Sequence, residues 1–286
     1  MTAPAAGDTR KLAELRDTID AIDAEMHRLL VERGSVIDAL IRAKGTDRSG
    51  AAFRPLREAD MMRRIVARHD GGLPIATVEH IWREIITTFT RMQAPFDVAI
   101  DGSAASDRMR DLARFYFGFS VNLLTQPDAA AVVAHVAATG DLGIVARDRS
   151  SSAGAWWRDL GGPSGPQIMA VLPYIAMAGR PADLPAFVVS PRLSDPSPPD
   201  VRILAVSAID DVALPEGCSV LGSSMGEGVN ELLVAVPGML DIAEIGAGSG
   251  GRLESIVDVG GIASGIAIDR ASSILYQRPE TPGKTE

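Results

Sequence analysis

The 286-residue chain holds only one cysteine, Cys218, and four histidines. A single cysteine excludes an internal disulfide framework and fits a reducing compartment. The histidines are scattered, so we expect no metal site. No run of about 18 apolar residues occurs, so we predict no membrane-spanning helix. The first eleven residues lack the apolar stretch of a secretory signal. We therefore expect a cytoplasmic protein.

What the chain does contain is a large apolar fraction and an uneven charge. Hydrophobic residues make up 46% of it, enough for packed cores, and the length suits more than one domain. Residues 1–95 hold 15 basic and 14 acidic residues, whereas residues 96–286 hold 13 and 23. The acidic excess of the second part argues against a nucleic-acid partner.

Three helices are predicted in the first 95 residues. Residues 10–44 show apolar residues every three or four positions, the pattern of a helix lying along another helix: Leu12, Leu15, Ile19, Ile22, Met26, Leu29, Val36 and Leu40. A second helix starts near Pro55 and runs to His69, and a third runs from about Pro74 to Ala94. The third carries Val78, Trp82, Ile85, Phe89 and Met92. The first helix overshoots the other two, so its apolar stripe needs a partner. We infer an intertwined homodimer.

After Pro95 the composition shifts toward Gly, Ser, Ala and Pro, which indicates an α/β or α+β region. Helices are expected at 107–117 and 129–138, and strands at 96–100, 142–146, 186–190, 201–207, 232–236 and 266–268. The proline-rich stretch 191–200 reads as an internal linker. The predicted domains are residues 1–95, 96–190 and 191–286, so the chain is expected to be multidomain, with an all-α part followed by an α/β part.

Arg33 breaks the apolar stripe of the first helix, at a position where the spacing calls for an apolar side chain. Burying an unpaired guanidinium is costly, so an anion must meet it. That anion is either a neighbouring acid, in a structural ion pair, or a bound ligand. Lys44 lies eleven residues on, about 16 Å along nearly the same face. Arg16 lies about 25 Å away and about 100° round the helix, so it cannot share a pocket with Arg33 of its own helix. It is either a solvated helix arginine or, in an antiparallel dimer, a residue that enters the partner's pocket.

Several separated motifs together resemble the all-helical (AroQ-type) chorismate mutases. They are Leu15-Arg16-Asp17 with Ile22-Asp23, Glu32-Arg33, Ala43-Lys44, Arg54-Pro55-Leu56-Arg57-Glu58, Ile81-Trp82-Arg83-Glu84-Ile85-Ile86 and Gln93. The resemblance covers about residues 10–95. It implies a three-helix bundle in an intertwined dimer, converting chorismate to prephenate in phenylalanine and tyrosine biosynthesis. It implies no cofactor and no metal.

The resemblance also implies roles for individual residues. Arg33, and Arg16 from the other subunit, would bind the two carboxylates of chorismate, since guanidinium groups grip carboxylates bidentately. Lys44 and Gln93 would donate hydrogen bonds to the ether oxygen. Glu58 would accept a hydrogen bond from the ring hydroxyl, and Arg57 would order that end of the pocket.

Two positions depart from the family pattern. Phe89 stands where a small hydroxyl residue is common, which removes one polar contact to a substrate carboxylate. Arg54 stands where some relatives have an acid. The resulting Arg-Pro-x-Arg-Glu form resembles the variant found ahead of prephenate dehydratase domains.

Residues 97–190 resemble a degenerate prephenate dehydratase domain, through Ala113–Gly118, Asp141–Val145 with Ser150–Gly154, and Leu184–Ser190. No Thr-Arg-Asp run is present, and Gly154 and Ile168 lie too close for a second lobe. We therefore expect no dehydratase activity, and a role as scaffold, dimer extension or sensor. The run Gly246–Gly251 satisfies G-x-G-x-x-G, but we expect a glycine-rich loop there, and we expect Trp156-Trp157 to be local packing.

Two alternatives to the mutase remain open. One is an isochorismate–pyruvate lyase, which uses the same helical fold. The other is a non-catalytic, mutase-like regulatory or partner-binding subunit, which Phe89 would favour.

Overall fold

The computed structural model describes residues 6–44, 52–147, 154–162, 164–193, 197–209, 211–226, 228–248 and 253–268. The chain divides into two compact units, Met1–Asp47 and Arg48–Glu286. Among the described residues, no helix is both long enough and apolar enough to cross a membrane.

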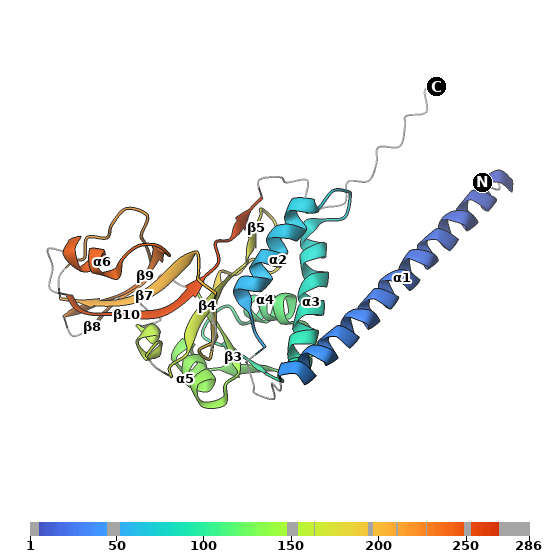
Figure 1. Ribbon diagram of the computed structural model, residues 1–286. Helices are drawn as coiled ribbons and strands as arrows, with labels where there is room; N and C mark the ends of the chain where they lie inside the picture. Colours follow the sequence, from blue (N-terminus) through green and yellow to red (C-terminus); the bar gives the residue numbers. More distant parts are fainter. Residues whose placement is uncertain are drawn as a thin grey trace, which may run out of the picture. The chain divides into compact units, whose positions relative to one another are not determined.

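The first unit consists of helix α1 (Ala6–Lys44), 39 residues without interruption (Figure 1). At 1.5 Å per residue it is about 58 Å long. The predicted long helix is therefore confirmed, beginning four residues earlier than expected. Its apolar stripe stays exposed in the single chain: Leu15, Ile19 and Ile22 each keep more than half of their surface.

The second unit opens with the other two predicted helices, α2 (Pro55–Arg68) and α3 (Ile75–Gln93). Pro55 occupies the first turn of α2, where its missing N–H costs nothing. The helices run side by side (Figure 1) and share a core with residues of the sheet region, among them Tyr174 and Ile175. The three-helix prediction is confirmed, as is the α/β region after it.

A nine-stranded mixed sheet forms the rest of the second unit, in the order β2-β1-β3-β6-β4-β10-β7-β9-β8. The strands are β1 (Val98–Asp101), β2 (Leu123–Gln126), β3 (Leu142–Ala146), β4 (Gln167–Leu172), β6 (Ala186–Ser190), β7 (Val201–Ala208), β8 (Ser219–Gly226), β9 (Val229–Pro237) and β10 (Leu253–Ile262). The strands β2, β1 and β3 are parallel, whereas β8 and β9 form an antiparallel hairpin whose strand β9 also pairs antiparallel with β7. β5 (Ile175–Ala176) and β11 (Ile266–Ala267) pair separately.

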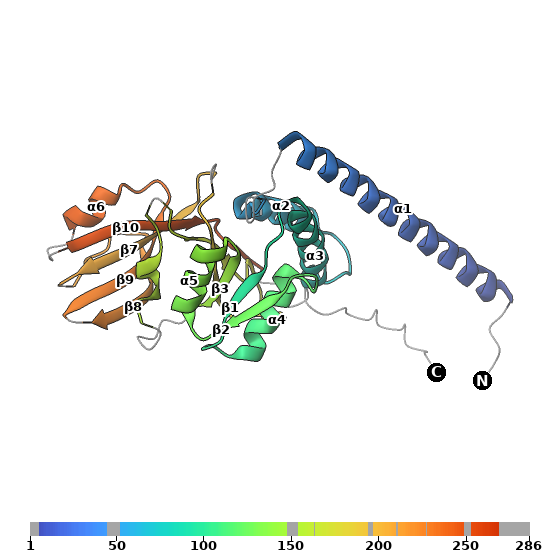
Figure 2. The ribbon, with the colours of Figure 1, turned by 90° about the horizontal axis from the view of Figure 1, so that it is seen from below.

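Helices α4 (Ser106–Phe117) and α5 (Ala129–Thr139) cover opposite faces of the parallel strands (Figure 2). Alternation along β1 explains this: Val98 and Ile100 pack with α4, whereas Ala99 packs with α5. Gly143 of β3 lets α5 approach closely, because a Cβ there would lie 2.5 Å from a methyl group of Val132.

The part of the sheet formed by β7, β9 and β8 carries helix α6 (Ile242–Gly248), whose Ile245 packs on Leu204 and Val234. The expected glycine-rich loop is thus partly wrong, because Gly246 and Gly248 lie in this helix. The glycine run begins within helix α6, and strand β10 follows the run. A nucleotide-binding turn needs the reverse order.

The sheet runs through both of the domains predicted after residue 95, because β10 pairs with β4 and β7. The stretch 191–200 therefore connects β6 and β7 of one sheet. The predicted domain boundaries themselves remain a prediction. The short 3-10 helix η2 (Trp156–Asp159) buries both tryptophans, as expected of local packing.

Candidate functional site

Three of the predicted site residues lie on α1. Arg16 is exposed, Arg33 is half-buried, and Lys44 is the last residue of the helix. The side chain of Lys44 lies outside the described part of the structure. Because α1 is a unit of its own, these residues are located only by their places along the helix. All three lie within α1, as the predicted helix requires.

The remaining predicted residues lie on α2 and α3. Arg57 is exposed on the first turn of α2, and the neighbouring Glu58 points inward. Gln93 ends α3, where its Nε2 donates to the carbonyl oxygen of Phe89 at 3.0 Å. An amide nitrogen has two hydrogens, so one remains for a ligand. Arg54 donates to the carbonyl of Phe53 at 3.0 Å.

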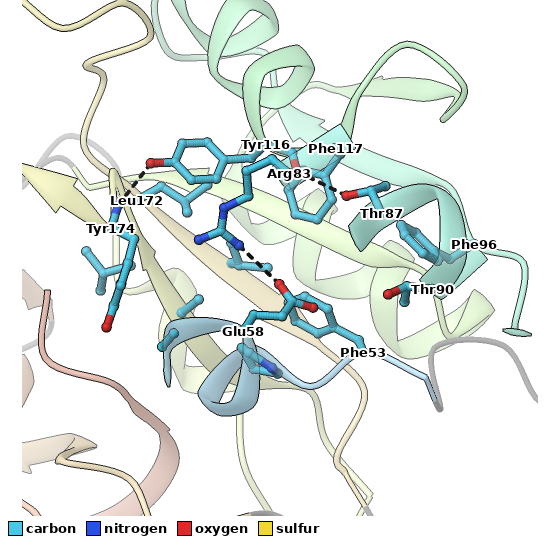
Figure 3. A pocket seen from close by; sticks show the side chains of 15 residues that line it. Phe53, Glu58, Arg83, Thr87, Thr90, Phe96, Tyr116, Phe117, Leu172 and Tyr174 are labelled. Atoms are coloured by element: carbon cyan, nitrogen blue, oxygen red, sulfur yellow. Dashed lines mark hydrogen bonds and ion pairs between the residues drawn. The ribbon is translucent and has the colours of Figure 1, made fainter. Parts of the chain in front are cut away.

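The structure brings Glu58 together with Arg83, a residue to which the sequence analysis gave no role. Arg83 Nη1 donates to Glu58 Oε2 at 3.1 Å, and the two side chains are 9% and 15% exposed (Figure 3). The guanidinium carbon of Arg83 also lies 5.1 Å from the ring centre of Tyr116 on α4, a cation–π contact.

The buried face of α3 contains a polar stripe, beside the buried Ile75, Ala76 and Ile86, in place of the expected apolar stripe. Its members recur at three- and four-residue spacing: Glu79, Arg83, Thr87 and Thr90. The apolar stripe found in the sequence is only half-buried, and Met92 at its end is 52% exposed. The spacing of the polar residues was the signal that could have identified this face.

Glu79 joins α3 to the sheet region through buried charges. Its carboxylate lies 3.2 Å from Arg180 Nη2, and neither side chain is more than 1% exposed. Glu79 also accepts a hydrogen bond from the hydroxyl of Tyr116 at 3.1 Å. That hydroxyl in turn accepts one from the backbone N–H of Tyr174 at 3.0 Å.

Burial dominates the electrostatics of both acids. Loss of water raises the pKa of Glu58 above its ordinary value, while Arg83 and the backbone at Arg54 oppose that rise. Burial likewise raises the pKa of Glu79, against the opposing charges of Arg180 and Arg83. Two carboxyls and two guanidinium groups thus balance in formal charge inside the protein.

Beside the Glu58–Arg83 pair lies a small cavity of about 30 Å³ between α2, α3, α4 and β4 (Figure 3). Thr87 and Thr90 line it on the α3 side, and Tyr174 on the sheet side. A cavity of this size holds a water or two.

A second, larger cavity of about 220 Å³ lies beside Arg202 and Arg192. Arg202 pairs with Asp258 at 2.8 Å, and Arg192 donates to the carbonyl of Gly162 at 2.7 Å. None of the predicted site residues lines it. The described residues contain no group of three or more His, Cys, Asp or Glu side chains able to hold a metal ion.

Comparison with known proteins finds similarity to part of the chain. The family model described as chorismate mutase type II matches residues 15–94. The chain is 33% identical over 112 residues to a bifunctional chorismate mutase/prephenate dehydratase of Neisseria gonorrhoeae. That match covers 39% of this chain and 30% of the relative. No solved structure matches the chain.

These findings confirm the resemblance drawn from the separated motifs. The family model covers residues 15–94, and the chain spans about 30% of the length of the relative that it matches. Residues 15–94 match the chorismate mutase type II model, and an α/β region with a large mixed sheet follows them in this chain.

Proposed function

We propose that the protein is a cytoplasmic chorismate mutase. The observation that carries this proposal is the match of residues 15–94 to the chorismate mutase type II family, with the motif residues Arg16, Arg33, Lys44 and Glu58 in the family's order. The relative, a bifunctional chorismate mutase/prephenate dehydratase, supports the same activity.

The reaction is a unimolecular [3,3] rearrangement of chorismate to prephenate, which needs no nucleophile and no coenzyme. The protein has to hold a compact conformer of the substrate, an orientation effect. It also has to stabilise the negative charge that grows on the breaking C–O bond, through donors fixed in advance. A millionfold acceleration corresponds to about 8 kcal/mol.

The proposed site residues divide between these two tasks. Arg33, together with Arg16 of a second copy, holds the two carboxylates and so selects the conformer. Lys44 and the free hydrogen of the Gln93 amide donate to the ether oxygen. Losing one charged donor of this kind costs about 3 kcal/mol of transition-state stabilisation.

At the other end of the substrate, Glu58 accepts a hydrogen bond from the ring hydroxyl. Arg57, the preceding residue, is exposed in the single chain. In the proposed dimer it orders the hydroxyl end of the pocket.

The second copy is proposed because one chain leaves the apolar stripe of α1 open to solvent. On α1 the exposed residues include Leu15, Ile19 and Ile22. On α3, Met92 at the end of the half-buried apolar stripe is 52% exposed. A monomer that exposes this much contiguous apolar surface is unusual, and a two-fold intertwined dimer covers it.

No dehydratase activity is proposed for the region after residue 95. The sequence lacks a Thr-Arg-Asp run, and only thirteen residues lie between Gly154 and Ile168. We propose that this region, a degenerate relative of the dehydratase domain, serves as a scaffold, a dimer extension or a sensor.

Product identification on the full-length chain tests the proposal. Chorismate should disappear and prephenate should appear in equal amount. Conversion of isochorismate to pyruvate and salicylate, with chorismate untouched, would favour the lyase. No turnover of either compound would favour the non-catalytic subunit.

A further inference from the structure

The buried partner of Glu58 is the feature that the proposed mechanism leaves unexplained. Glu58 is the acid proposed to meet the ring hydroxyl, yet its carboxylate is held at 3.1 Å by Arg83. Arg83 comes from the polar stripe of α3, whereas the proposed ether-oxygen donor Gln93 lies on the last turn of that helix. One helix thus carries both groups.

Arg83 is itself held by several elements. Its guanidinium lies over the ring of Tyr116 at 5.1 Å. The same ring carries the hydroxyl that bonds Glu79 and the backbone of Tyr174. Thr87, one turn further along α3, donates to the carbonyl of Tyr116 at 3.1 Å. Tyr116, whose ring packs on Arg83, is thus itself fixed by three hydrogen bonds, and Arg83 Nη1 donates to Glu58.

We propose that Arg83 is a positioning residue of the mutase site, which fixes the Glu58 carboxylate in the ionised form and orientation that receive the ring hydroxyl. This inference rests on the proposed function, because the orientation of Glu58 matters to the reaction only if Glu58 contacts the substrate. A carboxylate has four lone-pair directions. One Arg83 N–H occupies a single direction on Oε2, which leaves Oε1 for the hydroxyl.

The groups around Glu58 make its charge depend on Arg83. Arg83 faces it from α3, and the backbone at Arg54 faces it from the start of α2. Tyr116 from α4 and Tyr174 from the β4–β5 connection line the adjoining cavity and are neutral near pH 7. Arg83 is therefore the nearest side-chain charge that favours the carboxylate over the acid. Removing it should move the ionisation of Glu58 to higher pH.

The test compares Arg83→Gln and Arg83→Lys in the full chain, each with and without Glu58→Gln, by pH profiles of kcat/KM. Arg83→Gln should lower kcat/KM at pH 7 about tenfold or more and move the acid limb to higher pH. Arg83→Lys keeps the charge and should recover much of the loss. In the Glu58→Gln background, Arg83→Gln should cost far less, because its target is gone.

Arg108→Gln is the matched control, because it breaks an exposed pair with Asp183 at 2.9 Å. It should leave the profile unchanged. Equal costs of the Arg83 substitutions with and without Glu58 would overturn the proposal and leave Arg83 a structural ion-pair member. If Arg83→Gln does not fold, Arg83→Lys and the Glu58→Gln/Arg83→Gln pair decide the matter, since neither leaves an unpaired charge. A wild-type chain without mutase activity overturns both this proposal and the proposed function.

Discussion

Arg33 interrupts the apolar stripe of α1 with a charged side chain. Its substitution should therefore lower activity rather than stability. Arg33→Ala removes a proposed carboxylate ligand without opening a cavity in a core, because the residue is only half-buried. We expect mutase activity to fall by more than about a hundredfold while the dimer stays folded. Steady-state kinetics with light scattering checks this. Unfolding in step with lost activity would favour a structural ion pair.

Glu58 gives the activity its expected pH dependence. Burial raises the pKa of its carboxyl above the ordinary value of 4.5. The ionised form accepts the ring hydroxyl, so kcat/KM should fall as the pH drops through that raised pKa, in a range above 4.5. Glu58→Gln cannot ionise and should be slower but flat over the same range. An identical acid limb in Glu58→Gln would assign it to another group.

Helix α1 should affect association more than the stability of a single chain. Ile22 is 54% exposed in one chain, so Ile22→Glu should cost the isolated helix little. In the proposed dimer two such side chains are buried, and their loss should weaken association by at least about 3 kcal/mol. Sedimentation should show dissociation of Ile22→Glu at concentrations where wild type is dimeric. Ala24→Glu, on the opposite face, should stay dimeric. Equal behaviour of both variants would exclude this stripe from the interface.

Element prediction succeeded where the periodicity was strong and local. The helices beginning at Ala6, Pro55 and Ile75 follow from apolar spacing and from prolines at helix starts. Strands β8 and β10 were not expected because Gly, Ser and acidic residues interrupt their apolar pattern, as in Ser219–Gly226. Their strand form comes from pairing with distant partners, which no local sequence window records.

The candidate site was predictable only in part, for the same reason. Family motifs picked out Glu58, but its partner Arg83 depends on how α3 packs on α4 and the sheet. Glu79 is separated from Arg180 by about a hundred residues of sequence, yet the two side chains touch. The spacing Glu79, Arg83, Thr87 signals a polar face, but the sequence alone cannot say what lies opposite.

At the scale of the whole second unit, the Glu79–Arg180 pair links helix α3 to the sheet region. Arg180→Met leaves a buried carboxylate without its nearest cation and should destabilise the unit by about 3–5 kcal/mol at pH 7. The loss should shrink as the pH falls, because burial raises the pKa of Glu79 and protonation removes its charge. Denaturant unfolding measures this.

Two further variants calibrate that measurement. Adding Glu79→Gln to Arg180→Met should restore part of the stability, since no buried charge then remains unpaired. Arg108→Met breaks an exposed pair and should cost about 0–1 kcal/mol. An Arg180→Met effect as small as that of Arg108→Met would show that the pair contributes nothing to the link.

Mixing two inactive variants tests most directly whether the chain is a mutase whose sites are shared between two copies. Arg16→Ala and Arg33→Ala should each be nearly inactive alone. After subunit exchange, half of the dimers should be mixed, and each mixed dimer should hold one intact site. Prephenate formation should then reach about a quarter of the wild-type rate. If the mixture stays as inactive as its components while exchange is complete, no site is built from Arg33 of one chain and Arg16 of its partner.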